Sequence, residues 1–278
     1  MAVPHGKLVK VKGKNMHVRQ MGSGEKTIVL LPGLGCQLPS VDFAPLMRVL
    51  SKKYTVCTVE LFGYGHSDGT DTPRTNENYV DEIREALTLS GLNPPYVIMP
   101  YSASGIYAEY YAAKYPNEID GLILLDGSET TESIAKEWHY TEEMIKEAYG
   151  ELEATDDIPK YREWGYTEEE IHEMVGVPNH LRTELAQDIA LSANVYEVLT
   201  MPIPKNIPIL VFNSEMVGLG EDERAINEQH RKDHIARLGG NVKKRVVIKG
   251  SKHTDIAYHH DYRKIICQEI DVFLECSK

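Results

Sequence analysis

Residues 96–111 read YVIMPYSASGIYAEYY, which is a short apolar run, then a group of small residues, then a helical pattern. The pattern predicts a strand, a tight turn and a helix, with Ser102 at the turn. A serine at such a junction has its hydroxyl exposed above the edge of a sheet, where a nucleophile can be displayed. Ser102 is therefore the first candidate for a catalytic residue.

The turn departs from the G-x-S-x-G pattern of a nucleophile elbow, because Pro100 and Ser104 occupy the two glycine positions and Gly105 comes one place later. Serine is small enough for the second position. Proline lacks an N–H and has a fixed φ, which the last residue of a strand tolerates. The structural alternative is that Ser102 is only the N-cap of a helix that begins near Ala103.

Length and composition limit the classes of function. The 278 residues, of which 42% are hydrophobic, are enough for one domain with an insertion or for two smaller domains. The net charge is −12 and no basic stripe is present, so we expect neither nucleic acid nor an anionic membrane as a partner. No apolar segment resembles a signal peptide or is long enough to span a bilayer, which favours a cytoplasmic protein. The sequence does not fix the oligomeric state.

The four cysteines are scattered along the chain with no C-x-x-C spacing: Cys36, Cys57, Cys267 and Cys276. This spacing suggests neither a zinc site nor a disulfide framework, and we expect unpaired thiols.

Strands and helices alternate along most of the chain. The sequence predicts a hairpin at 7–20 and strands at 27–31, 54–60, 96–99, 119–126, 207–212 and 246–248. It predicts helices at 41–53, 79–89, 226–238 and 258–274, besides the one that follows Ser102. Alternation at this spacing is typical of βαβ units and a mostly parallel sheet.

The alternation breaks between residues 130 and 204. This segment is acidic and helix-forming, has no strand pattern, and contains both tryptophans, Trp138 and Trp164. We therefore predict an α/β core domain made of residues 1–129 and 205–278, interrupted by a helical cap at 130–204.

These features together resemble the α/β-hydrolase superfamily along nearly the whole chain. LLPGLG at 30–35 resembles that family's strand and H-G-x oxyanion loop, with Pro32 in place of histidine. ELFGYGHS at 60–67 is similar to its D-x-x-G-x-G-x-S loop, with Glu60 in place of aspartate, and GSKH at 250–253 is in the family's position for the catalytic histidine. The resemblance implies a mostly parallel sheet flanked by helices, with the cap inserted after the strand that follows the nucleophile helix.

A serine hydroxyl needs a base within hydrogen-bond reach and a third group that orients the base. His253 is the best candidate for the base, because it is in a loop between an apolar strand and the last helix, where the resemblance places the histidine. The alternative is an ordinary solvated loop histidine.

Two carboxylates compete for the third position. Asp126 follows the strand after the nucleophile helix, a position that some members of the superfamily use, although an aspartate there is also a common turn former. Glu215 follows the later strand, near the family's usual position, which Met216 or Val217 occupies here. We place Asp126 ahead of Glu215, with Glu221 and Asp222 further away.

Other histidines are weaker candidates. His230 and His234 are four residues apart on a predicted helix, a spacing that suits metal ligands, but their charged neighbours favour a solvated face. His172-Glu173 lacks the second histidine of a zinc-protease helix. His259 and His260 are expected at the surface.

The resemblance also implies an oxyanion hole formed by the backbone N–H groups of Leu34 and Ala103. Trp138 and Trp164 of the cap are candidates for substrate contacts, with packing of the cap as the alternative.

The sequence thus predicts a serine hydrolase that cleaves an ester or related acyl bond through an acyl-enzyme, with no metal or organic cofactor. Serine at the elbow argues against the haloalkane dehalogenase and epoxide hydrolase branches, which the cap otherwise resembles. Two alternatives stay open: an aminopeptidase or C–C bond hydrolase with the same triad, and a ligand receptor on a degenerate hydrolase scaffold.

Overall fold

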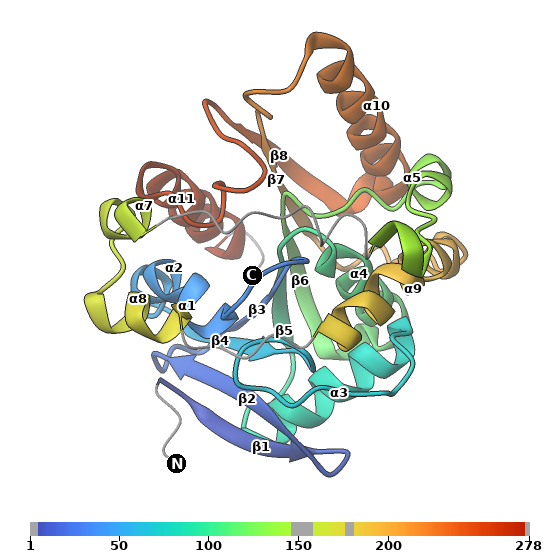
Figure 1. Cartoon of the computed structure of the whole chain (residues 1–278). Helices are drawn as coiled ribbons and strands as arrows, with labels where there is room; N and C mark the ends of the chain where they lie inside the picture. The colour runs from blue at the N-terminus through green and yellow to red at the C-terminus, as the bar shows by residue number, and fades with distance from the viewer. Residues whose placement is uncertain (1–4, 146–157, 176–180, 276–278) are drawn as a thin grey trace.

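The computed structural model describes residues 5–145, 158–175 and 181–275. Its centre is an eight-stranded sheet with the order β1-β2-β4-β3-β5-β6-β7-β8 (Figure 1). The strands are β1 (Lys7–Val11), β2 (Lys14–Met21), β3 (Thr27–Leu31), β4 (Thr55–Glu60), β5 (Tyr96–Pro100), β6 (Ile119–Leu125), β7 (Ile209–Ser214) and β8 (Val242–Ile248). Strands β1 and β2 form the predicted antiparallel hairpin, β2 pairs antiparallel with β4, and the other neighbours are parallel. The predicted mostly parallel sheet is therefore confirmed.

Helices cover both faces of this sheet (Figure 1). They are α1 (Pro39–Asp42), α2 (Ala44–Leu50), α3 (Asn76–Leu89), α4 (Ser104–Lys114), α5 (Glu132–Glu137), α7 (Ile158–Glu163), α8 (Glu168–Val175), α9 (Leu181–Leu199), α10 (Glu221–Leu238) and α11 (His260–Glu275), with short 3-10 turns at Pro116–Glu118 and Gly239–Asn241. The helix predicted at 41–53 is instead two short helices separated at Phe43. Proline stands in the first turn of each, at Pro39 and Pro45, where its fixed φ favours the start of a helix.

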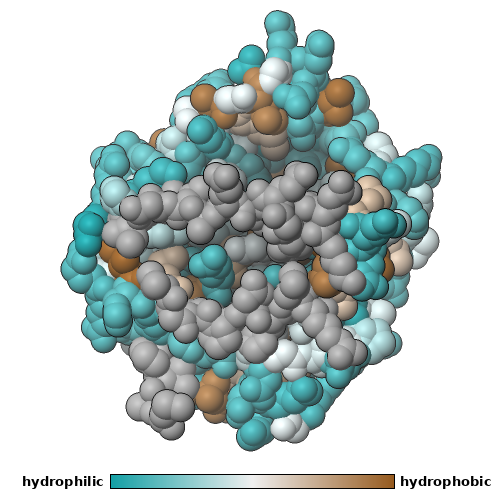
Figure 2. Space-filling view, in the orientation of Figure 1, coloured by the Kyte–Doolittle hydropathy of each residue, from teal (hydrophilic) through white to brown (hydrophobic). Residues whose placement is uncertain are grey.

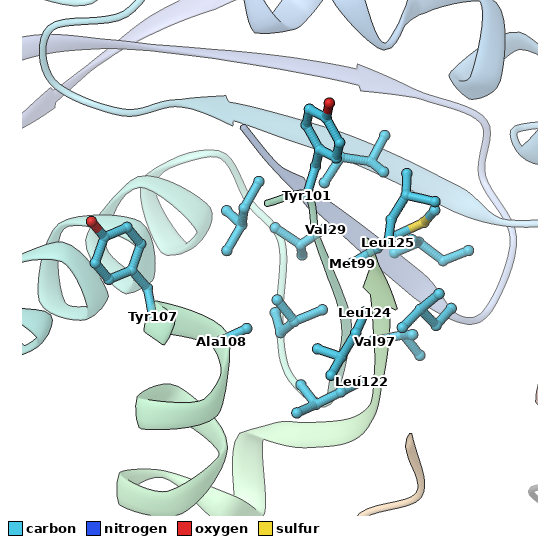
Figure 3. Packing of buried hydrophobic residues seen from close by; sticks show 14 of the residues in the cluster. Val29, Val97, Met99, Tyr101, Tyr107, Ala108, Leu122, Leu124 and Leu125 are labelled. Atoms are coloured by element: carbon cyan, nitrogen blue, oxygen red, sulfur yellow. The ribbon is translucent and has the colours of Figure 1, made fainter. Parts of the chain in front are cut away.

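The core lies against the central strands. All residues of β3 and β5 are buried, as expected for parallel strands covered on both faces. Figure 3 shows side chains of β3, β5 and β6, including Val29, Met99 and Leu124, beside the helix that carries Tyr107 and Ala108. This packing holds β5 and α4 rigidly, and the turn between them carries Ser102.

The described part of the segment between β6 and β7 is helical and lies in two places (Figure 1). Helices α5 and α9 lie beside α4, whereas α7 and α8 lie beside α1, α2 and α11. Leu38 and Val41 pack with Tyr166, Ile171 and Met174 in a second apolar cluster, which joins α8 to the loop before α1.

Ion pairs add to this attachment of α8. Glu170 binds Arg48 at 2.6 Å, and Glu173 binds His66 at 2.8 Å. Figure 2 shows that the described residues around this face of the molecule are mainly hydrophilic, with scattered hydrophobic patches.

Three of the cysteines, Cys36, Cys57 and Cys267, are buried and unpaired, and Cys276 lies outside the described residues. None of the helices in the described ranges combines the length and the apolar character that crossing a membrane requires.

Candidate active site

The site is built around the turn between β5 and α4. Ser102 has φ of 53°, a left-handed conformation that strains a residue with a side chain and is typical of a nucleophile elbow. Its Oγ lies 2.9 Å from Nε2 of His253. The N-cap position of α4 belongs to Ala103, without a side-chain cap, so the Ser102 hydroxyl faces the histidine and is not the cap of the helix.

The residues at the altered glycine positions fit this turn. Pro100 is the last residue of β5, where its missing N–H leaves the parallel pairing with Leu31 intact. The Ser104 hydroxyl donates a hydrogen bond to the carbonyl of Pro32 and so ties α4 to the loop after β3. At Gly105 a Cβ would lie 3.2 Å from the backbone nitrogen of Ser128, which is a tight contact. The close approach that favours a glycine is therefore at Gly105, one residue after the second glycine position of the G-x-S-x-G pattern.

His253 is fixed from two sides in the loop after β8. Its ring stacks on Tyr101, with 5.4 Å between the ring centroids, and the Tyr101 hydroxyl donates to the His253 carbonyl at 2.6 Å. Its Nδ1 lies 2.8 Å from Oδ2 of Asp126. The structure thus brings Ser102, His253 and Asp126 into one continuous chain of hydrogen bonds.

Asp126 follows β6 and is only 4% exposed. Its other oxygen, Oδ1, accepts hydrogen bonds from the backbone N–H of Ser214 at 2.9 Å and from the Arg231 guanidinium at 3.0 Å. Burial alone raises the pKa of this carboxyl, but the hydrogen bond and charge of His253, the charge of Arg231 and hydrogen bonding by Ser214 together lower the pKa to about 2. Asp126 is therefore a fixed negative charge at any ordinary pH.

The competing carboxylates lie elsewhere. Glu215 binds Lys249 at 2.7 Å and the backbone N–H of Gly250 at 2.8 Å, and these hydrogen bonds lower its pKa. Glu221 and Asp222 are exposed in the first turn of α10. Of the candidate acids, the structure joins only Asp126 to His253.

The expectation of a solvated face around His230 and His234 is wrong for Arg231 and His234, although Lys232 and Asp233 between them are exposed. Arg231 and His234 are 5% and 3% exposed, and Nε2 of His234 lies 2.6 Å from Oε1 of the buried Glu109. The charged neighbours in the sequence were misleading, because this face of α10 supplies cations to two buried carboxylates, Asp126 and Glu109. Pairing of this kind is what permits buried carboxylates to stay ionised.

The loop after β3 lies against Ser102. A Cβ at Gly33 would lie 2.8 Å from the Ser102 Cβ, so only glycine permits this approach. Leu34 follows directly, and Ala103 lies at the N-terminus of α4, where backbone N–H groups favour a negative charge. Among the hydrogen bonds recorded for residues in the described ranges, neither the Leu34 nor the Ala103 N–H has a protein acceptor.

A cavity of about 350 Å³ adjoins the two turns that carry Ser102 and His253. Immediate sequence neighbours of Ser102 and His253, namely Tyr101 and Thr254, line it together with Leu34. The described helices between β6 and β7 contribute further lining residues, and Trp164 at the end of α7 is one of them. Trp138, by contrast, packs against the main core cluster.

One group of side chains near the start of α11 has the donor atoms of a metal site. In the ranges that the structure covers, His259, His260 and Asp261 bring donor atoms within 4.8 Å of one another. They are consecutive residues around the start of α11, two of them exposed, and they contribute no atom to the hydrogen-bond chain of Ser102.

The sequence missed three residues that shape the site: Tyr101, Ser214 and Arg231. A tyrosine beside the nucleophile and a serine at a strand end carry no distinctive signal. Arg231 stood in a run of charged residues, and only its spacing from His234 on one helix face set it apart.

Comparisons with known proteins agree with this fold and geometry. Two curated relatives are similar to this chain: the uncharacterized protein YbdG of Bacillus subtilis, 40% identical over 121 residues (44% of this chain and 37% of YbdG), and the serine hydrolase BPHL of Homo sapiens, 33% identical over 119 residues (42% and 40%). The chain thus spans about two fifths of the length of these relatives.

A solved structure, a thermophilic esterase from Thermogutta terrifontis, has a TM-score of 0.70 with 17% identity and covers 98% of this chain and 99% of its own. At that identity the likeness concerns the fold alone. Residues 26–199 match the sequence profile described as the alpha/beta hydrolase fold. The chain belongs to the alpha/beta hydrolase fold family.

Proposed function

We propose that the protein is a serine hydrolase that cleaves a carboxylic ester, or a related acyl bond, of a small and partly apolar molecule through an acyl-enzyme. The observation that carries this proposal is the hydrogen-bond chain from Ser102 through His253 to the buried Asp126. The resemblance to BPHL, named a serine hydrolase, supports the same class of reaction.

In the first half of the reaction, the Ser102 Oγ attacks the carbonyl carbon while Nε2 of His253 takes the hydroxyl proton. The Asp126 carboxylate holds Nδ1 of the imidazole and stabilises the imidazolium that forms. The N–H groups of Leu34 and Ala103 stabilise the negative oxygen of the tetrahedral intermediate. His253 then gives its proton to the leaving alcohol, which leaves the acyl group bonded to Ser102.

In the second half, His253 takes a proton from water, and the resulting hydroxide attacks the acyl carbon. The acid is released when the proton returns to Ser102. The described helices between β6 and β7 supply lining residues to the adjacent cavity, and we propose that residues 130–204 are a cap that shields this step from bulk water.

The cytoplasmic location stays a prediction of the sequence.

The direct test is turnover of p-nitrophenyl acetate and butyrate by the purified chain. We expect release of p-nitrophenol at a rate proportional to enzyme concentration, faster than in buffer containing heat-denatured protein. Absence of ester turnover, together with cleavage of aminoacyl-p-nitroanilides, would replace the esterase with the aminopeptidase.

The dependence of kcat/KM on pH should reflect the ionisation of the base, His253, and of no other residue. Only the neutral imidazole of His253 accepts the serine proton, so kcat/KM should rise with pH through a single ionisation. The pKa of Asp126, near 2, excludes this carboxyl as the source of the rise. The profile of kcat/KM between pH 5 and 9 measures this rise. In His253→Ala, both the rise with pH and nearly all of the activity should be lost. An active His253→Ala protein would assign the base to another group.

The two tryptophans should differ in their effects. Because Trp164 lines the cavity and Trp138 packs on the core, Trp164→Ala should change the ratio of kcat/KM values among acetate, butyrate and octanoate esters by about tenfold. Trp138→Ala is the matched control and should lower the thermal midpoint while leaving the ratio nearly unchanged. Equal ratios in both variants would contradict a role for Trp164 in selectivity.

A further inference from the structure

The cavity beside Ser102 contains one acidic group that the proposed chemistry does not use. Asp42 is the last residue of α1, lines the cavity and is 7% exposed. One carboxyl oxygen, Oδ2, accepts the backbone N–H of Leu38 at 3.2 Å. Among the hydrogen bonds and ion pairs recorded for the described residues, no side chain donates to Asp42 and no cation pairs with it.

A carboxyl in this state is costly, since a buried carboxylate is normally paired with a cation or with several donors. Burial, with a smaller effect from the charge of Glu60, raises the pKa of Asp42 to about 7, against the opposing hydrogen bond from Leu38. Asp126, by comparison, has both Arg231 and His253. Asp42 is therefore as buried as a carboxylate that serves a structural role, but it lacks the paired cation that such a carboxylate has. It also faces a cavity, where a ligand could supply that cation.

Aromatic residues form much of the wall around this carboxyl. Tyr101 and Tyr258 make an edge-to-face pair with centroids 5.6 Å apart on the core side, and Trp164 and Tyr166 line the cap side. The Tyr166 hydroxyl donates to the Asp42 backbone carbonyl at 2.6 Å, which holds this ring next to α1. Aromatic rings attract cations in desolvated sites, and a carboxylate adds a full opposite charge.

The lining contains one basic side chain from the described residues, Lys160, which is solvent-exposed. Its charge is screened by water far more than that of a group buried beside Asp42. The electrostatics of the inner cavity therefore favour a positive occupant.

We propose that this cavity binds an organic ammonium group of the substrate, with the Asp42 carboxylate as its counter-ion and the aromatic wall around it. The substrate class inferred here rests on the proposed function: it is an ester that carries an amine. The cavity is lined by Leu34, Tyr101 and Thr254, and the last two are the immediate sequence neighbours of Ser102 and His253, so a substrate with its ammonium group in the cavity extends toward the Ser102 hydroxyl. The ammonium supplies the partner that the buried carboxyl lacks.

The test measures binding, which does not depend on turnover. The Ser102→Ala protein is titrated by calorimetry at pH 8 with butylammonium chloride and with 1-butanol, a neutral molecule of similar size. We expect butylammonium to bind at least about tenfold more tightly. Asp42→Asn in the same background should abolish the difference, whereas Glu215→Gln, which removes an exposed carboxylate outside the cavity, should keep it.

A pH series on the Ser102→Ala protein gives a second readout that does not need an Asp42 variant to fold. Between pH 6 and pH 8 the affinity for butylammonium should rise by about tenfold as Asp42 ionises, while that for butanol stays constant. Glu60 has a lowered pKa, and burial raises the pKa values of Cys36, Tyr101, Tyr166 and Tyr258, so these neighbours keep their charge states.

His253, whose neighbour Thr254 lines the cavity, is a second group whose charge can repel a cation. The rise must therefore persist in Ser102→Ala with His253→Gln. Equal affinities for butylammonium and butanol at pH 8, or an unchanged preference in folded Asp42→Asn, would overturn the proposal. If the protein hydrolyses neutral esters but does not bind butylammonium, this inference is refuted and the proposed function stands. If it binds butylammonium but hydrolyses no ester, the proposed function is refuted and this inference stands.

Discussion

Ser102→Ala should lower kcat for p-nitrophenyl esters by about a thousandfold or more, because the variant has no atom that can form the acyl bond. The thermal midpoint should stay within a few degrees of the wild-type value. The Ser102 side chain is only partly buried and bonds only to His253, so its removal opens no cavity in the core.

Ser104→Ala is the matched control, two residues away. It loses the hydrogen bond to the Pro32 carbonyl and leaves the nucleophile in place, so it should keep most of the activity. A Ser102→Ala protein with most of its turnover would place the nucleophile elsewhere. A variant that unfolds would instead give Ser102 a structural role.

Asp126→Asn should lower kcat by at least about a hundredfold. An asparagine amide cannot satisfy this site in either orientation. If its NH₂ faces Nδ1 of His253, it favours the wrong imidazole tautomer; if its oxygen faces His253, its NH₂ meets the donors of Ser214 and Arg231. The measurement is kcat under saturating ester, with the thermal midpoint recorded for the same preparation.

Glu215→Gln is the control for this second variant, because Glu215 also follows a strand of the sheet but binds Lys249 and Gly250. We expect its kcat to fall by less than about threefold. The reverse ranking of the two variants would transfer the orienting role to the loop after β7 and make Asp126 a turn residue.

The sequence was sufficient for the parts of this site that depend on local pattern. Strand β5 is a continuous, buried apolar run that ends two residues before Ser102, whereas β8 is mostly exposed or half-buried and is apolar only over its last three residues, 246–248, ahead of His253. Ser102 could therefore be proposed from the end of a strand, whereas His253 also needed the resemblance to the α/β-hydrolase superfamily. The helix predicted at 41–53 shows the limit, since Pro45 lies in the first turn of a second helix and Pro39 in that of an earlier one, with the break at Phe43.

The acid could not be decided in the same way. Asp126 and Glu215 both follow parallel strands, and the difference between them lies in contacts with residues far away in the chain. Arg231 reaches Asp126 across 105 positions, and His253 reaches it across 127. No local pattern encodes such contacts. The sequence did not reveal Asp42 either, because its surroundings include Tyr166, 124 positions away, whose hydroxyl donates to the Asp42 carbonyl.

Covalent labelling tests the central claim, that Ser102 is an activated nucleophile, most directly. The protein is incubated with a fluorophosphonate probe, and its intact mass and the mass of its labelled peptide are measured. The account predicts one adduct per chain, located at Ser102, absent in Ser102→Ala and strongly slowed in His253→Ala. An unmodified wild-type chain, or an adduct that persists in Ser102→Ala, would contradict it.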